Sequence, residues 1–86
     1  MNALDNEDDR RGFARWLRQQ AEARQWRQRE LASACGVSQQ TASRWLSGQS
    51  APAGIHLRSL AVALDITTDE LLEIMGHIPE EPKGPQ

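Results

Sequence analysis

The stretch from Gln28 to Gly48, QRELASACGVSQQTASRWLSG, predicts two short helices joined by a tight turn. Its apolar residues recur every three or four positions, which is the period of the buried face of a helix. They are Leu31, Ala32 and Cys35 before the turn, and Ala42 and Trp45 after it. Gly36 lies between the two groups, where glycine is favoured because it ends a helix in the left-handed conformation. Ser38 is placed to cap the second helix, and Gly48 to end it.

The second of these helices, predicted from Ser38 to Leu46 or Ser47, has a polar outer face. The residues on this face are Gln39, Gln40, Ser43, Arg44 and Ser47. Glutamine amides and arginine guanidinium groups form paired hydrogen bonds with the edges of adenine and guanine in the major groove. The segment is therefore interpreted as a helix-turn-helix motif, and the leading hypothesis is a module that reads the sequence of double-stranded DNA.

Length and composition predict one small domain. The chain has 86 residues, of which 38% are hydrophobic, and this is enough for a single core. No run of about 18 apolar residues is present, and the opening MNALDNEDD does not resemble a secretion signal. The single Cys35 can form neither an internal disulfide nor a zinc site, so it is interpreted as a small buried residue rather than a redox switch. These features predict a cytoplasmic protein.

The net charge of -2 is unevenly distributed along the chain. Residues 10–58 carry nine arginines and two acidic residues, whereas the segments on either side are acidic. A polyanion responds to the local field of a surface rather than to the total charge. The basic segment coincides with the predicted motif, which favours DNA binding over the alternative that the arginines only solvate two helices.

Three further helices complete the prediction of an all-α fold. The first is expected to follow a cap at Asp5 or Asn6 and to run to Ala23 or Arg24. Its inward residues are Phe13, Leu17 and Ala21, with Trp16 beside them. Gly12 weakens this helix by about 1 kcal/mol relative to alanine and leaves its start open. Trp26 is expected to fill the space between this helix and the next.

The last two helices are predicted from about Ala53 to Leu64 and from Thr68 to about Met75. The expected buried residues are Leu57, Leu60, Ala61 and Leu64, followed by Leu71, Leu72 and Met75. Thr67 and Glu70 have the spacing of a capping box at the start of the last helix. The predicted organisation is a flexible acidic segment over 1–8, a helix-turn-helix domain over 9–78 and a disordered tail over 79–86.

The pattern from Phe13 to Leu72 resembles the lambda-repressor-like, or XRE-type, DNA-binding domain. The resemblance rests on QRELA (28–32), CGVS (35–38), the spacing of Gly48 and Pro52, LAVALDI (60–66) and TTDELL (67–72). It implies a five-helix lambda-repressor-like fold in which the third helix enters the major groove and the second lies across the backbone. It also implies a bacterial or phage-encoded, nucleoid-associated transcription regulator, most often a repressor, that binds a palindromic operator as a dimer.

The resemblance assigns roles to individual residues. The expected base-reading residues are Gln39, Gln40, Arg44 and Ser43. The expected backbone-contacting residues are Gln28, Arg27, Ser38, Thr41, Ser47, Gln49 and Arg24, where Arg24 and Arg29 are nearby alternatives to Arg27. Ser38 could instead serve only as a cap. Trp45 takes a position usually held by a smaller residue, which is interpreted as repacking of the core, the alternative being a stacking contact at an interface.

The chain departs from the family where an arginine in the first helix usually pairs with a glutamate late in the third. The matching positions are Ala21 and Leu46, so both partners are absent together. An apolar contact is expected to replace the salt bridge, which can be neutral or stabilising. The same change removes a cation that often touches phosphate.

Partners and rival functions follow from the remaining residues. A homodimer is expected, with its interface formed by Ile74, Ile78, Leu72 and Ile55. The alternative is an antitoxin-like or adaptor module that mainly binds a protein partner, such as a toxin or RNA polymerase. An enzyme is not expected, because His56 and His77 lack a paired acid and nucleophile. No metal site or cofactor is predicted.

Overall fold

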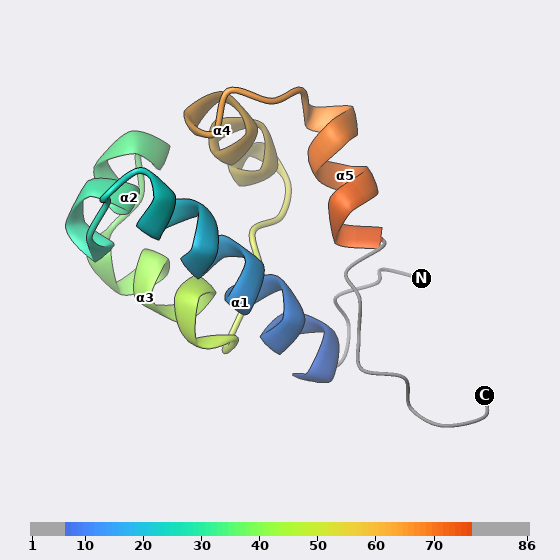
Figure 1. Ribbon diagram of the computed structural model, residues 1–86, viewed down its shortest axis with the longest axis horizontal. Coiled ribbons are helices and arrows are strands. Elements are labelled where there is room, and N and C mark those ends of the chain that lie inside the picture. Colours follow the sequence, from blue (N-terminus) through green and yellow to red (C-terminus); the bar gives the residue numbers. More distant parts are fainter. Residues whose placement is uncertain (1–6, 77–86) are drawn as a thin grey trace.

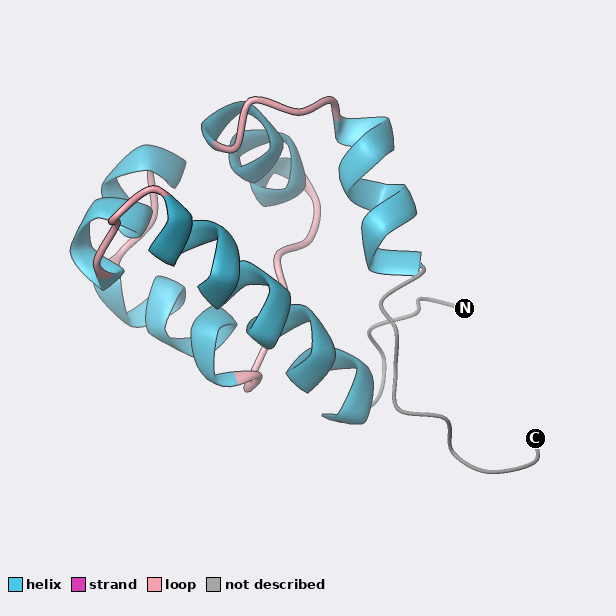
Figure 2. Ribbon diagram, in the orientation of Figure 1, coloured by secondary structure: helices cyan, strands magenta, loops and turns pink. Residues whose placement is uncertain are grey.

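The computed structural model describes residues 7–76, and within that range the chain folds into helices joined by short loops, without a β-strand (Figures 1 and 2). The five helices are α1 (Glu7–Ala23), α2 (Gln28–Cys35), α3 (Gln39–Ser47), α4 (Ile55–Ala63) and α5 (Thr68–Gly76). The predicted all-α, five-helix class is confirmed. Asp5, Asn6, His77, Ile78 and the tail over 79–86 lie outside the described residues. None of the helices seen over 7–76 combines the length and the apolar character needed to cross a membrane.

The helices pack as a small bundle with α3 and α5 on opposite sides of α1. The main helix pairs are α1 with α3, α2 with α3, α2 with α4, and α4 with α5. Figure 1 shows α2 and α3 at one end of the molecule and α5 at the other. The exposed side chains of α5 include Asp69, Glu70 and Glu73, and this helix contains no lysine or arginine. The acidic helix is therefore separated from the helix-turn-helix segment.

The core joins side chains from all five helices. Its largest fully buried members are Trp45, Phe13, Leu17, Leu31, Leu60 and Leu71. The predicted inward stripes are confirmed except at two positions: Leu72 is 47% exposed, and Leu57 is only partly buried against the core. Leu71 and Met75 are four residues apart on one side of α5, and successive residues of a helix point about 100° apart. Leu72 therefore lies beside the buried side of α5, whereas the preceding residue, Leu71, lies on it.

Local signals place the ends of α2 and α3 as expected. Gly36 and Gly48 end these helices with φ angles of 70° and 82°, in the left-handed region that glycine tolerates best. The Ser38 hydroxyl accepts a hydrogen bond from the Thr41 backbone N–H at 3.1 Å, so the predicted cap of α3 is confirmed. At α5, the Thr67 and Glu70 side chains accept from each other's backbone N–H groups, which confirms the capping box.

The start of α4 differs from the predicted boundary near Ala53. The helix begins at Ile55, after Gly54 adopts a φ of 58° and a ψ of -131°. This conformation is far from helical geometry, and no side chain caps the helix. The break at Gly54 therefore places the first turn of α4 two residues after the approximate start near Ala53 that the sequence predicted.

Cys35 lies in the core with 4% of its surface exposed, as the sequence predicted. Desolvation by burial raises the pKa of its thiol from 9.0 to about 11. Only the thiolate is nucleophilic, so at pH 8 the native thiol should react with a disulfide reagent about 100-fold more slowly than the unfolded chain. The measurement is the reaction rate with and without urea, and equal rates in the two states would contradict the burial of Cys35.

Raising the pKa also has a defined effect on stability. The folded state favours the neutral thiol, and this preference contributes to the free energy of unfolding. The contribution is fully present below about pH 9, the ordinary pKa of the thiol. It is lost progressively as the pH rises towards 11, because the unfolded chain then releases the proton more readily.

Candidate nucleic-acid interface

The outer face of α3 presents the side chains that the sequence singled out. Gln39, Gln40 and Arg44 are exposed, whereas Ala42 and Trp45 point into the core with 0% and 2% exposure. Gln40 and Arg44 are one helical turn apart, so they lie on the same side of α3. An amide and a guanidinium group are therefore exposed side by side on a helix whose opposite face packs against the core. Ser43 is half-buried beside them.

Gln28 links the start of α2 to the start of α3. Its side-chain nitrogen Nε2 donates a hydrogen bond to the Gln39 carbonyl oxygen at 3.2 Å. An amide nitrogen carries two hydrogens, so one N–H of Gln28 is not used by this bond. The bond couples a candidate phosphate-contacting residue directly to the backbone of the helix that carries the candidate base-reading residues.

An open hollow of about 390 Å³ lies at this junction, lined by Arg27, Gln28, Arg29 and Gln39. Arg27 occupies the N-cap position of α2, where its side chain makes no capping hydrogen bond and is exposed. The Glu30 carboxylate instead accepts the Arg27 backbone N–H at 2.6 Å. Two guanidinium groups and an amide thus surround a surface depression, which is a favourable arrangement for a phosphate group.

The hydroxyl groups around α3 are partly used within the protein. Ser38 donates its hydroxyl hydrogen to the Thr41 Oγ1 at 3.0 Å while also capping α3. Ser47 donates to the Arg44 carbonyl oxygen at 3.2 Å. A hydroxyl has only one hydrogen to donate. Thr41 is therefore better placed than Ser38 or Ser47 to donate to an external acceptor.

A comparison with family models gives one match, described as Helix-turn-helix, over residues 17–71. The chain belongs to the lambda-repressor-like, XRE-type helix-turn-helix family. No curated protein and no solved structure matches it significantly. The matched segment runs from α1 to α5 and includes the whole α3 surface described above. The protein is therefore a helix-turn-helix domain of a DNA-binding family.

Within the helix-turn-helix domain, Arg24 is held by contacts to the protein itself. Its guanidinium donates to the carbonyl oxygens of Gln20 and Leu64, each at 3.0 Å, and lies 5.7 Å from the ring centre of Trp26. These contacts tie the end of α1 to the end of α4, with Trp26 packed against the core as expected. The Arg24 guanidinium therefore has fewer donors left for a phosphate than those of Arg27 and Arg29, for which no side-chain hydrogen bond is seen among the described residues.

The structure adds a contact that sequence reasoning missed, between α1 and the last turn of α3. The Arg18 guanidinium donates to the Leu46 carbonyl oxygen, and Arg10 Nε donates to the Gly48 carbonyl oxygen at 3.3 Å. Ala21 is buried and Leu46 packs against the core, so neither position carries the charge usual in the family. The cation absent at position 21 is thus present one turn earlier, at Arg18. The available signal was the spacing of Arg11, Arg15 and Arg18 along one side of the helix.

The helix-turn-helix domain also exposes large apolar side chains away from α3. Ile55, Val62 and Leu72 are 74%, 72% and 47% exposed. Ile55 and Val62 are seven residues apart on α4 and therefore share one side of that helix. Ile74 is half-buried, and Ile78 lies outside the described residues. Val62 was missed by sequence reasoning, although the same seven-residue spacing from Ile55 could have indicated it.

Proposed function

We propose that this helix-turn-helix domain is a transcription regulator that binds a specific sequence of double-stranded DNA. The observation that carries the proposal is the exposed polar face of α3, where Gln39, Gln40 and Arg44 project from a helix anchored by Trp45. In this arrangement α3 enters the major groove and the start of α2 meets the DNA backbone. Occupation of an operator by the domain blocks transcription, so we propose repression as its effect.

The proposed base contacts follow from side-chain chemistry. Gln39 and Gln40 are suited to the N6 and N7 atoms of adenine, and Arg44 to the O6 and N7 atoms of guanine. Each good paired contact contributes about 1–3 kcal/mol of discrimination against the wrong base. Ser43, beside Arg44, is suited to a single further hydrogen bond.

The proposed backbone contacts surround α3. Gln28, Arg27 and Arg29 at the hollow are suited to one phosphate group, and Thr41 offers a hydroxyl donor nearby. Ser47 and Gln49 flank the end of α3, where exposed polar groups support a further contact. Such contacts fix the position of the protein on the duplex but do not read the sequence.

We further propose that the domain acts as a homodimer on an inverted repeat. The exposed side chains of Ile55, Val62 and Leu72 support an apolar contact with a second copy. The proposed interface also includes Ile74 and Ile78, which continue the apolar sequence at the end of α5. A twofold dimer presents two copies of α3 to the two halves of a palindromic site.

The same apolar residues also support a second candidate function, in which a protein partner rather than a second copy covers them. Cytoplasmic location is part of the proposal.

The test is selection of binding sequences from random duplex DNA, with the wild-type protein and a Gln40→Ala variant compared in parallel. We expect an inverted repeat for the wild type and, for the variant, loss of preference at one symmetric pair of positions. The cost per half-site should be about 1–3 kcal/mol for the affected base.

Gln19→Ala is the matched control, because Gln19 is an exposed glutamine on α1 rather than on α3. This variant should select the wild-type consensus at every position. Selection of a single half-site without a repeat would contradict the dimer. Absence of any enriched sequence at moderate salt would contradict DNA reading and favour the protein-partner function.

A further inference from the structure

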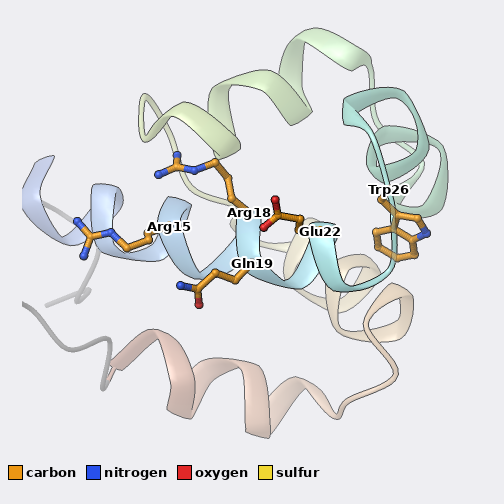
Figure 3. Close-up of a pocket in the computed structure, with 5 residues that line it drawn as sticks. All are labelled: Arg15, Arg18, Gln19, Glu22 and Trp26. Carbon is orange, nitrogen blue, oxygen red and sulfur yellow. The ribbon is translucent and has the colours of Figure 1, made fainter.

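We propose that Arg15 and Arg18 form a second phosphate-binding contact at the C-terminal end of the recognition helix α3. This inference rests on the proposed function, since the ligand is the backbone of the same duplex. Both arginines are exposed and lie three positions apart on α1, so their side chains leave the same side of that helix (Figure 3).

The position of Arg18 is fixed by its hydrogen bond to the Leu46 carbonyl oxygen in the last turn of α3. A guanidinium has five N–H donors, so this bond leaves most of the donor capacity of Arg18 for another acceptor. Close packing of α1 against this end of α3 is also visible at Gly48, where an added Cβ would lie 3.3 Å from Arg11 Cγ. The α1 side chains are thus held beside the end of the reading surface.

Arginines lie at both ends of α3, and the distance between the two ends suits the major groove. Arg27, Gln28 and Arg29 lie at its N-terminal end, and Arg18 contacts Leu46 near its C-terminal end. From Gln39 to Leu46 the helix rises about 10 Å, which is comparable with the width of the major groove, about 12 Å. Cations at both ends of α3 can therefore reach phosphates on both strands that border the groove.

The loop after α3 provides no cation for this second contact. Gln49, Ser50 and Ala51 carry no charge. The charge at this end of α3 comes instead from α1, where Arg15 and Arg18 line a hollow of about 380 Å³ together with Gln19, Glu22 and Trp26. Figure 3 shows Trp26 at the far end of this hollow and Glu22 next to Arg18. The Glu22 carboxylate repels a phosphate, so it should weaken the contact that the two arginines provide.

The experiment measures the affinity of the full chain for the selected duplex and for an unrelated duplex over a range of sodium chloride concentrations. The variants are Arg15→Gln, Arg18→Gln and Glu22→Gln, and each is first checked by its melting temperature. Arg58→Gln is the matched control, because Arg58 is an exposed arginine on α4 that loses the same charge.

We expect each of the two α1 arginine variants to lower the slope of log affinity against log salt by about one. At 0.1 M salt this is about a tenfold loss of affinity for each variant, equal on the two duplexes because phosphate contacts do not depend on sequence. Glu22→Gln should strengthen binding, and Arg58→Gln should keep the wild-type slope.

The decisive variant is Arg15→Gln, because Arg18 also contributes a hydrogen bond to the fold. If wild-type protein binds DNA and Arg15→Gln keeps its slope and affinity, the second contact is wrong while the proposed function stands. If the Arg58 control loses as much as Arg15→Gln, the effect is one of total charge, and the contact is again wrong. If the wild type binds neither duplex, the proposed function itself fails, and this inference falls with it.

Discussion

Replacing Trp45 with alanine is expected to lower the free energy of unfolding by about 3–5 kcal/mol, because it removes the largest fully buried side chain. Trp45 is 2% exposed and belongs to the core, and its ring meets His56 edge-on at a centroid distance of 5.8 Å. Small domains have only about 5–15 kcal/mol of stability in total. The variant should therefore melt roughly 15 °C or more below the wild type, as measured by circular dichroism.

The matched control is Trp16→Ala, which deletes the same side chain from a half-buried position on α1. Trp16 packs at the edge of the core, 5.7 Å from the Phe13 ring centre. Less contact is lost there, so its melting temperature should fall by clearly less. A Trp45→Ala protein that melts within a few degrees of the wild type would show that Trp45 is not a core residue. The alternative use of Trp45 at an interface would then return.

Alanine at Gly48 is expected to destabilise the domain more than alanine at Gly36. Both glycines have positive φ angles, 82° and 70°, so each substitution costs about 1–2 kcal/mol of backbone strain. Only Gly48 faces another helix: an added Cβ would lie 3.3 Å from Arg11 Cγ and 3.4 Å from its Cα, whereas nothing lies within 4 Å at Gly36. The crowding at Gly48 should add about 1 kcal/mol, because α1 at Arg11 must move by a few tenths of an ångström to make room.

Urea unfolding of the two alanine variants measures this difference directly. Gly36→Ala serves as the control, because it imposes similar strain at the end of a helix without the contact to α1. A larger loss at Gly48 supports the close approach of α1 to the end of α3. Equal losses at the two sites would contradict that approach, and with it the placement of the α1 arginines.

The sequence predicted α2 and α3 to within one residue because several local signals agree there. Apolar spacing, the Ser38 cap and the left-handed glycines all depend on neighbours in the chain. The start of α4 was predicted only approximately, near Ala53, because the sequence offers no cap there, and the backbone of Gly54 places it at Ile55. The predicted burial of Leu72 was wrong because Leu71 and Leu72 are equally hydrophobic. Only the packing of α5 decides which of them is buried.

The candidate interface also has a part that the sequence predicts and a part that it does not. The outward residues of α3 follow from helical period alone, so Gln39, Gln40 and Arg44 could be predicted as exposed. The contacts of Arg18 with Leu46 and of Arg24 with Leu64 join residues 28 and 40 positions apart. No local pattern specifies such pairs, because they depend on how α1 crosses the other helices. The sequence therefore indicated a basic segment without showing which arginines serve the fold.

The acidic surface of α5 has a consequence for the kinetics of association. Helix α5, which carries the exposed Asp69, Glu70 and Glu73, lies on the opposite side of α1 from α3 (Figure 3), so the charges of the described residues form an electric dipole across the bundle. Near a polyanion this dipole exerts a torque that turns the acidic end away and presents the recognition helix first. A larger share of collisions then begins in a productive orientation, which raises the association rate most strongly at low ionic strength.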